Sequence, residues 1–241
     1  MVSTSTTREP VQNRAHMGNG QWLIVCEGTK TEPNYFAGFL EYLYEKGGRD
    51  LSSFVEIQGL GLGTESLVRS AEKFFEIVET EYGRMRLPCG NVAAVFDKDT
   101  FTKGSFNYAI KLADLQRKKY SGLERYIAVW SNESFELWVY LHFHYTDSAM
   151  TRYELNTKLT EIFRTGGVIS GKKSYSSGVK TKNTIFQDIL KCGGSPARAV
   201  RNAERLSGIY SDDTKYADHN PRTEVWRLVK ALAEESGVRL D

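Results

Sequence analysis

The sequence contains few cysteines, and their spacing excludes a disulfide framework or a zinc site. The three are Cys26, Cys89 and Cys192, an odd number far apart in the chain. No two of them have the short separation of a zinc-ligand pair. Sparse, unpaired cysteines are typical of proteins that work in a reducing compartment, so we expect a cytoplasmic location.

Long apolar runs and a strong net charge are missing as well. No apolar run approaches the roughly 18 residues that a membrane span needs, so we expect no membrane partner. Residues 1–19 are polar without the apolar segment of a secretory signal, and we expect a mobile tail there. The net charge is only +2, which names no partner, and nothing indicates an oligomeric state. The 241 residues, 40% of them hydrophobic, suffice for one large or two small domains.

The segment at 91–100, NVAAVFDKDT, carries the strongest chemical signal in the chain. Apolar and small residues lead directly into Asp97 and Asp99, as at the carboxyl end of a buried strand. Two carboxylates so close repel each other unless a cation or a shared proton intervenes. A divalent ion bound through oxygen is one interpretation, and two solvated turn aspartates are the other.

Apolar segments alternate with helical patterns along the first part of the chain. We predict strands at 21–26, 54–58, 91–96 and 125–130, with helices from about 29–33, from 64 to about 82, and from the polar loop ending at Lys103 to about 119. This order predicts an α/β fold with a mostly parallel four-stranded central sheet and flanking helices. The core would cover 20–145.

The remainder of the chain is predicted to be largely helical. A helix in ESFELWVYLHF (133–143) should cap the sheet, and helices follow near 152–163, 184–190, 196–207 and 223–234, the last capped by Thr223. Residues 146–241 would form a helical extension packed on the core, with a basic loop at 166–182.

Glu27 follows the first predicted strand as the two aspartates follow the third. If these strands are neighbours, three carboxylates converge, and oxygen donors of this kind suit Mg²⁺ or Mn²⁺. Such an ion stabilises charge on a phosphoryl group or activates a water molecule. Gly28 can take the positive φ of a tight turn or allow close approach of the backbone to a ligand. Thr29 and Glu32 fit a capping box at the start of the next helix.

Two further acidic residues, Glu133 and Glu136, would share one face of the predicted helix. They are candidates for a second metal ion. The alternative is that one of them stabilises the amino end of the helix.

Basic residues are concentrated between 171 and 205, a segment that contains eight Lys or Arg and only two acidic residues. Binding of a polyanion and a solvated helix face are equally open interpretations. A phosphodiester-cleaving enzyme also needs a cation near the scissile phosphate. We take Lys182 as the candidate catalytic cation and Lys172, Lys173 and Lys180 as candidate nucleic-acid contacts. Lys98 and Lys103 could instead neutralise the acidic residues or touch phosphate.

Other motifs are predicted to be structural. The turn at 59–64 has Thr64 where a dinucleotide loop needs its third glycine. His142 and His144 have no third ligand at matching spacing, so a metal pair is not expected. His219 and Asn220 precede the last helix, and a role in supporting a site stays open.

Several segments together resemble a known family. They are LIVCEGTKTEPNYF (23–36), VFDKD (95–99), SNESFELWVYLHF (131–143), ARAVRNAERL (197–206) and NPRTEVWRLV (220–229). The strand-end glutamate and later DxD resemble the Toprim domain of topoisomerases, primases and OLD-type nucleases. The amino-acid sequences of these segments more closely resemble the RloB-like family, which is related to the AbiLii abortive-infection protein.

The resemblance implies a Toprim-like fold and a metal-dependent nuclease that acts on DNA or RNA in prokaryotic antiphage defence. By this resemblance Glu27 becomes a metal ligand and candidate general acid–base. Asp97 and Asp99 become metal ligands, and Glu136 a further acidic site residue. Glu133 stands where proline is usual in the family. The resemblance also permits a binding module that docks on an ATPase partner and senses nucleic acid without cutting alone.

Overall fold

The computed structural model describes residues 21–71, 90–120, 123–211 and 214–240. Within them a five-stranded sheet has the order β2-β1-β3-β4-β5. The strands are β1 (Gln21–Cys26), β2 (Val55–Gly59), β3 (Gly90–Asp97), β4 (Leu123–Asn132) and β5 (Arg222–Thr223). The first four pair in parallel, and β5 runs antiparallel to β4. The α/β class and the mostly parallel sheet are therefore confirmed.

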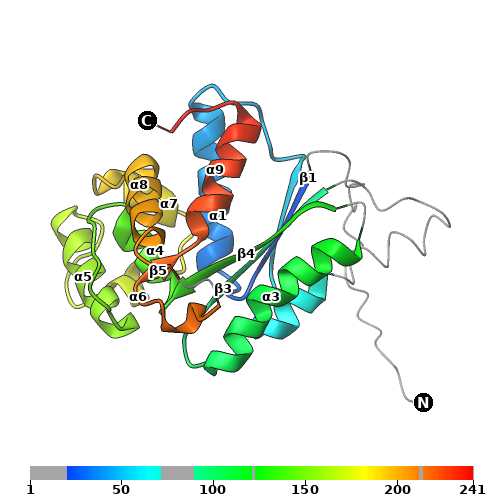
Figure 1. Cartoon of the computed structure of the whole chain (residues 1–241). Helices are drawn as coiled ribbons and strands as arrows, with labels where there is room; N and C mark the ends of the chain where they lie inside the picture. Colours follow the sequence, from blue (N-terminus) through cyan, green and yellow to red (C-terminus); the bar gives the residue numbers. More distant parts are fainter. Residues whose placement is uncertain (1–20, 72–89, 121–122, 212–213, 241) are drawn as a thin grey trace, which may run out of the picture.

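Helices cover both faces of this sheet (Figure 1). On one side lie α1 (Thr31–Glu45) and α9 (Val225–Ser236); on the other lie α3 (Lys103–Lys119) and a helix whose described part is 64–71. The remaining helices gather beyond the strand ends: α4 (Phe135–Leu141), α5 (Arg152–Thr165), α6 (Tyr175–Gly178), α7 (Ile185–Lys191) and α8 (Pro196–Ser207). None of the helices in the described part of the chain is long and apolar enough to cross a membrane.

The apolar run of β1 follows from this two-sided cover. Trp22 and Ile24 pack into the cluster beneath α1 and α9, whereas Leu23 and Val25 pack into the cluster beneath α3. Successive strand residues point to opposite faces, so a strand covered on both faces must be apolar throughout.

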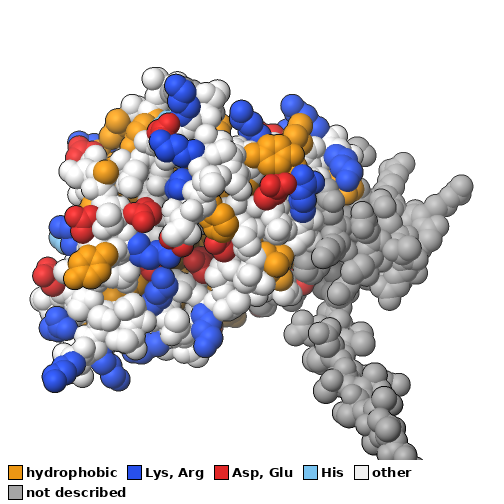
Figure 2. Space-filling model, turned by 90° about the horizontal axis from the view of Figure 1, so that it is seen from below, with side chains coloured by type: hydrophobic (Ala, Val, Ile, Leu, Met, Phe, Trp, Pro, Cys, Tyr) orange, Lys and Arg blue, Asp and Glu red, His pale blue; other side chains and the backbone are white. Residues whose placement is uncertain are grey.

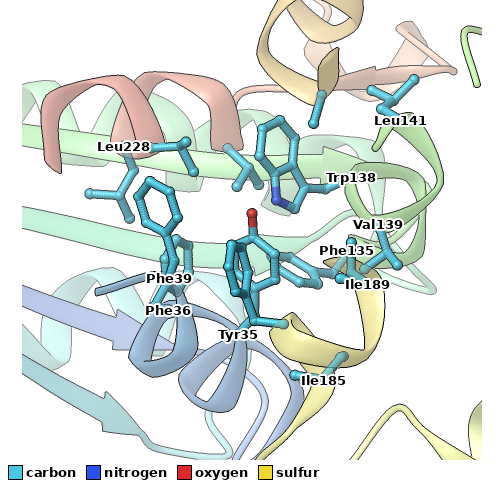
Figure 3. Close-up of a cluster of buried hydrophobic side chains, with 14 of the residues drawn as sticks. Tyr35, Phe36, Phe39, Phe135, Trp138, Val139, Leu141, Ile185, Ile189 and Leu228 are labelled. Carbon is cyan, nitrogen blue, oxygen red and sulfur yellow. The ribbon is translucent and has the colours of Figure 1, made fainter. Parts of the chain in front are cut away.

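Aromatic side chains join the sheet to the helices beyond it (Figure 3). Tyr35 on α1 makes edge-to-face contacts with Phe135, Trp138 and Phe186, which come from α4 and α7. Its hydroxyl lies 3.1 Å from Nε2 of the fully buried His142. One apolar core thus runs from β1 into the C-terminal helices.

The sheet has five strands among the described residues, so the prediction of four was wrong. Thr223 lies in β5 and was predicted only as a helix cap. The N-cap of α9 is Glu224, although the Thr223 hydroxyl accepts a bond from Val225 N at 3.4 Å. The C-terminal extension therefore adds a strand as well as helices. A two-residue strand has too short a pattern to be recognised in the sequence.

Two local predictions were also wrong. The N-cap of α1 is Lys30 and makes no side-chain capping bond, so Thr29 and Glu32 do not form a capping box. The basic loop at 166–182 contains the short helix α6, whose Tyr175 is fully buried. The predicted tail at 1–19, the helical residues 72–82 and Cys89 lie outside the described residues.

Candidate active site

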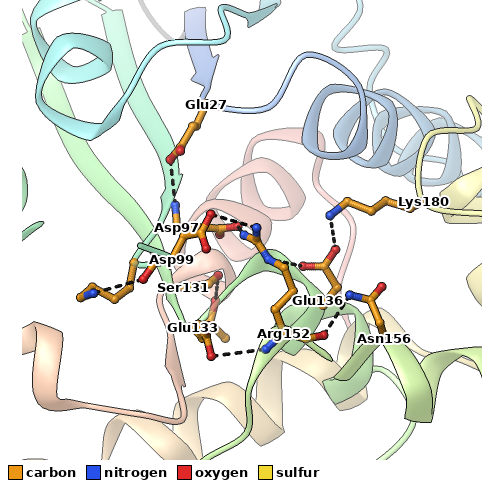
Figure 4. A network of polar contacts seen from close by, with 11 residues as sticks. Glu27, Asp97, Asp99, Ser131, Glu133, Glu136, Arg152, Asn156 and Lys180 are labelled. Atoms are coloured by element: carbon orange, nitrogen blue, oxygen red, sulfur yellow. Dashed lines mark hydrogen bonds and ion pairs between the residues drawn. The ribbon is translucent and has the colours of Figure 1, made fainter. Parts of the chain in front are cut away.

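Glu27 and Asp97 lie together because their strands are neighbours. In the parallel pairing of β1 with β3, Cys26 is opposite Val95, so both chains leave the sheet at the same edge. Glu27 N donates to Val95 O at 2.9 Å, and Asp97 N donates to Glu27 Oε2 at 3.2 Å (Figure 4). The expected meeting of carboxylates at the carboxyl edge is therefore present.

The loop after β3 holds Asp97 and Asp99 toward the same neighbour and turns Lys98 away. Asp99 has φ 34°, in the left-handed region that aspartate tolerates better than most residues. Its N–H donates to Glu133 O at 3.0 Å, while Lys98 Nζ donates to the carbonyls of Asp99 and Phe101. Lys98 thus stabilises the loop rather than the carboxylates.

Arg152, the first residue of α5, places its guanidinium among the acidic side chains. Nη2 lies 3.0 Å from Asp97 Oδ2 and Nη1 lies 2.9 Å from Asp99 Oδ2. Its Nε lies 3.8 Å from Glu136 Oε2. Figure 4 shows the three carboxylates facing this one side chain from β3, the following loop and α4.

Glu136 is 1% exposed and also pairs with Lys180, which follows α6. Lys180 Nζ lies 2.5 Å from Glu136 Oε1. Burial alone would raise the pKa of this carboxyl, but the Lys180 charge and hydrogen bond outweigh burial and lower the pKa below its usual value. Glu136 therefore stays ionised deep in the protein.

Glu133 does not share a helix with Glu136, contrary to the prediction, because α4 begins at Phe135. It follows a cis peptide bond after Asn132. Its Oε2 accepts from Arg152 N at 3.3 Å. Glu133 thus holds the backbone at the start of α5.

Glu32, predicted only as a capping residue, is a buried carboxylate directed at the same site. It is 9% exposed, and its Oε2 has no hydrogen-bond partner among the described residues. A Cβ on Gly28 would overlap that oxygen, so glycine leaves the space that the Glu32 side chain occupies. Gly28 was expected to take the positive φ of a tight turn or to let the backbone approach a ligand; here it leaves room for a neighbouring side chain.

Burial and mutual repulsion raise the pKa values of several of these carboxyl groups. Burial, together with the charges of Glu32 and Asp99, raises the pKa of Glu27 to about 7 despite the bond from Asp97. Burial and then the charges of Glu32 and Glu136 raise the pKa of Asp97. Burial and the Glu136 charge raise that of Glu32. The cluster therefore lacks positive charge even with Arg152 and Lys180 beside it.

The predicted lysines are dispersed. Lys172 and Lys173 are exposed, and Lys182 lies 3.8 Å from Asp188 rather than at the acidic cluster. Lys103 pairs with the exposed Asp218. Lys180 is the predicted lysine that reaches an acidic site residue. Figure 2 shows acidic and basic side chains intermingled on the face seen from below.

Two of the histidines pack in buried networks and a third is exposed. His142 packs against Tyr35 and Trp138, while His144 is exposed. His219 Nδ1 lies 3.0 Å from Arg222 Nη1, and Tyr210 stacks on its ring. Arg222 in turn donates to Glu224 Oε1 at 2.7 Å, so this buried network ties β5 to α9.

Sequence reasoning missed Glu32 and Arg152 as site residues. Glu32 had a usable signal, since it is a second acid five positions after Glu27 in the same motif. No sequence pattern identifies Arg152 as a site residue, because it lies more than fifty positions from either aspartate. It contacts them only through the placement of α5.

The donor set suits a divalent metal ion, although the carboxylates are arranged around a guanidinium. Among the described residues, no group of three or more His, Cys, Asp or Glu side chains has the geometry of a formed metal site. Carboxylate oxygens are nonetheless the ligands that Mg²⁺ and Mn²⁺ prefer. The unpartnered Glu32 oxygen and the raised carboxyl pKa values fit a site that accepts more positive charge.

Comparison with known proteins gives one match. Searches of curated proteins and of solved structures returned none. The family model for RloB-like proteins matches residues 22–232, which include β1 through most of α9 and every acidic residue of the site. The chain therefore belongs to the RloB-like protein family.

Proposed function

We propose that this chain is a Mg²⁺- or Mn²⁺-dependent phosphodiester nuclease that acts on DNA or RNA, with a Toprim-like fold. We place it in the prokaryotic cytoplasm, in antiphage defence by abortive infection. The observation that carries the proposal is the meeting of Glu27, Asp97 and Asp99 at the carboxyl edge of β1 and β3. Ligands of open α/β sheets bind at such an edge.

Asp97 and Asp99 would hold the ion, together with Glu27. Glu136 and Glu32 lie deeper and are the candidates for a second ion. When bound, such an ion polarises the phosphoryl group and activates a water molecule.

Glu27 has the properties of a residue that moves a proton. Burial is the main cause that raises its pKa to about 7 when no ion is bound, and a raised carboxyl pKa is what a proton acceptor near neutral pH needs. The bond from Asp97 N fixes one of its oxygens. A proton acceptor held in one place beside the substrate lowers the barrier to attack by water.

Lys180 is the candidate for the cation near the scissile phosphate. It is held by Glu136 and is partly exposed, so its charge reaches the mouth of the site. A fixed ammonium stabilises negative charge that develops on phosphate oxygens. The exposed Lys172 and Lys173 would contact the nucleic-acid backbone beyond it.

The test uses isosteric variants. Asp97→Asn and Asp99→Asn are expressed beside wild type, checked for folding by circular dichroism, and assayed on DNA and RNA with Mg²⁺ or Mn²⁺. We expect cleavage to fall by about a hundredfold or more, as for other groups that act in the transition state. Undiminished cleavage by both folded variants would refute the site.

A second candidate function is supported by the Arg152 contacts. A guanidinium paired with both aspartates is also how a structural, non-catalytic cluster is neutralised. The chain would then be a regulatory module that docks on an ATPase partner and senses nucleic acid. Calorimetry distinguishes the two: the module is favoured if Mn²⁺ gives no isotherm that Glu27→Ala removes while an ATPase co-purifies.

A further inference from the structure

Arg152 is the shared counter-ion of the candidate metal ligands. Two of its nitrogens contact two different aspartates at 2.9 and 3.0 Å, and the third faces Glu136 at 3.8 Å. The planar fork of a guanidinium, with several donors in fixed directions, suits such shared pairing better than a lysine would.

The backbone of Arg152 is anchored while its side chain has room to move. Arg152 N donates to Glu133 Oε2 at 3.3 Å, and Asn156 Nδ2 donates to Arg152 O at 2.9 Å. The preceding Thr151 forms a capping box with Glu154, which fixes the start of α5. The Arg152 side chain is 34% exposed. Rotation about its side-chain bonds can therefore withdraw the guanidinium without moving the helix.

A divalent ion would compete with this guanidinium for the cluster. Arg152 occupies Oδ2 of both aspartates, and two cations held close together repel each other in a partly buried site. Lys98 and Lys103 do not take over the role, because they pair with loop carbonyls and with Asp218.

We propose that a divalent cation displaces Arg152 from Asp97 and Asp99, and that the released guanidinium then binds a phosphate of the nucleic-acid substrate. The metal and the substrate are thereby coupled through one side chain at the mouth of the site. Guanidinium groups bind phosphate oxygens with two parallel hydrogen bonds, so the same fork serves both partners in turn. This proposal deepens the proposed function and rests on it for the identity of both ligands.

The test compares Arg152→Gln with Lys158→Gln, which removes the same charge from an exposed position on the same helix. Mn²⁺ affinity is measured by calorimetry, and affinity for a single-stranded oligonucleotide is measured by fluorescence anisotropy in Ca²⁺, with intact strands verified on a gel. For R152Q we expect Mn²⁺ to bind about tenfold tighter and the oligonucleotide about tenfold weaker. For K158Q we expect changes below about twofold.

The opposite signs separate this mechanism from a structural role, since a misfolded variant would lose both affinities. Mn²⁺ affinity that stays the same or falls in R152Q overturns the displacement. Oligonucleotide affinity that stays the same overturns the phosphate contact. If R152Q shows both affinity changes but the wild type cleaves neither DNA nor RNA, the nuclease proposal is refuted and the exchange stands.

A measurement without metal tests the counter-ion contact itself. In EDTA, melting temperatures are compared for wild type, Arg152→Gln, Asp97→Asn and the double variant. The double variant should lower the melting temperature by less than the two single changes together, because the loss of the Arg152–Asp97 contact is then counted only once. Additive effects would overturn the proposal.

Discussion

At the scale of single residues, the carboxylates at the sheet edge differ in charge because their neighbours differ. Glu136 stays ionised through Lys180, whereas burial and nearby carboxylates favour the protonated forms of Glu27 and Glu32. The pKa of Asp97 is also raised well above its usual value, since Arg152 offsets only part of the effect of burial and of the Glu32 and Glu136 charges. The same side-chain chemistry thus supplies both fixed negative charge and groups that titrate near neutral pH.

Gly28→Ala tests whether the Glu32 carboxylate belongs to the site. The new Cβ would overlap Glu32 Oε2, and the flexible carboxylate would move away while the backbone stays. We expect the melting temperature to change by only a few degrees, about 1 kcal/mol, and Mn²⁺ affinity to fall by about tenfold.

Gly104→Ala is the matched control, since a Cβ there meets nothing within 4 Å. It should leave Mn²⁺ affinity unchanged. Equal Mn²⁺ affinity in Gly28→Ala and wild type would place Glu32 outside the site.

The lowered pKa of the buried His142 predicts that the stability of the fold depends on pH. Burial lowers its pKa from 6.5 to about 4 in the folded protein. Its Nδ1 donates to the Trp138 carbonyl, which can only accept, so its Nε2 accepts from the Tyr35 hydroxyl. The unfolded chain binds a proton below pH 6.5 while the folded chain does not. The stabilisation is thus complete above pH 6.5 and is lost as pH falls toward 4.

Urea unfolding of wild type and His142→Gln at pH 7 and at about pH 4.5 isolates this effect. Between pH 7 and about pH 4.5, the free energy of unfolding should fall by about 2 kcal/mol more in the wild type than in the variant. The comparison is needed because Asp97 and Glu32, whose pKa values are raised, change stability in the opposite direction. Parallel pH profiles would contradict a buried neutral histidine.

At the scale of elements, the site depends on short segments rather than on the long helices. The loop after β3 directs both aspartates to the amino end of α5. The short helix α6 brings Lys180 to Glu136, on the amino-terminal turn of α4. The basic loop therefore contributes a defined contact to the acidic cluster in addition to solvated charge.

The two lysines on either side of Thr181 have different partners in the structure, and the one beside the acidic cluster is not the one predicted to be catalytic. Sequence reasoning favoured Lys182 as the catalytic cation, but Lys182 faces Asp188 and Lys180 faces Glu136. We expect Lys180→Met to lower cleavage by about a hundredfold, because a buried carboxylate loses its partner and the site loses a cation.

Lys182→Met should lower cleavage by less than about threefold, since an exposed ion pair contributes little. Initial rates on one oligonucleotide at saturating Mn²⁺ provide the comparison. A larger loss in the Lys182 variant would return the catalytic role to that residue.

At the scale of the whole molecule, the C-terminal residues complete the sheet and the core. β5 covers the outer edge of β4, and Ser131 Oγ lies 2.8 Å from Thr223 Oγ1. Helix α9 packs on β4 and α1. In the described structure the core and the C-terminal extension thus share one sheet and one apolar cluster.

Truncation before Asn220 should therefore abolish cooperative folding. It removes the buried side chains of Val225, Leu228, Val229 and Leu232 from the core. Burial of each contributes about 1.5–3 kcal/mol, so together they approach the whole stability of a typical domain. Circular dichroism and tryptophan fluorescence during urea unfolding provide the test, and a native-like transition in the truncated chain would contradict it.

Local patterns in the sequence were sufficient to predict much of the fold. The apolar runs of β1 and β3 and the helix at 196–207 depend on neighbouring residues, so periodicity revealed them. The acid at each strand end followed from the same reasoning, since parallel strands present their carboxyl ends at one edge. Glu27, Asp97 and Asp99 were predicted for that reason.

Only the tertiary structure decided which charges face these acids. The site draws Arg152 from α5, Glu32 from α1 and Lys180 from just after α6. The placement of these residues depends on packing between segments far apart in the chain. The strand β5 was missed as well, because two residues carry no recognisable pattern and their partner strand β4 is far away in the sequence. Local sequence was sufficient to predict the four parallel strands and the acidic residues at their ends. Long-range packing determined the cations that set the charge of that edge.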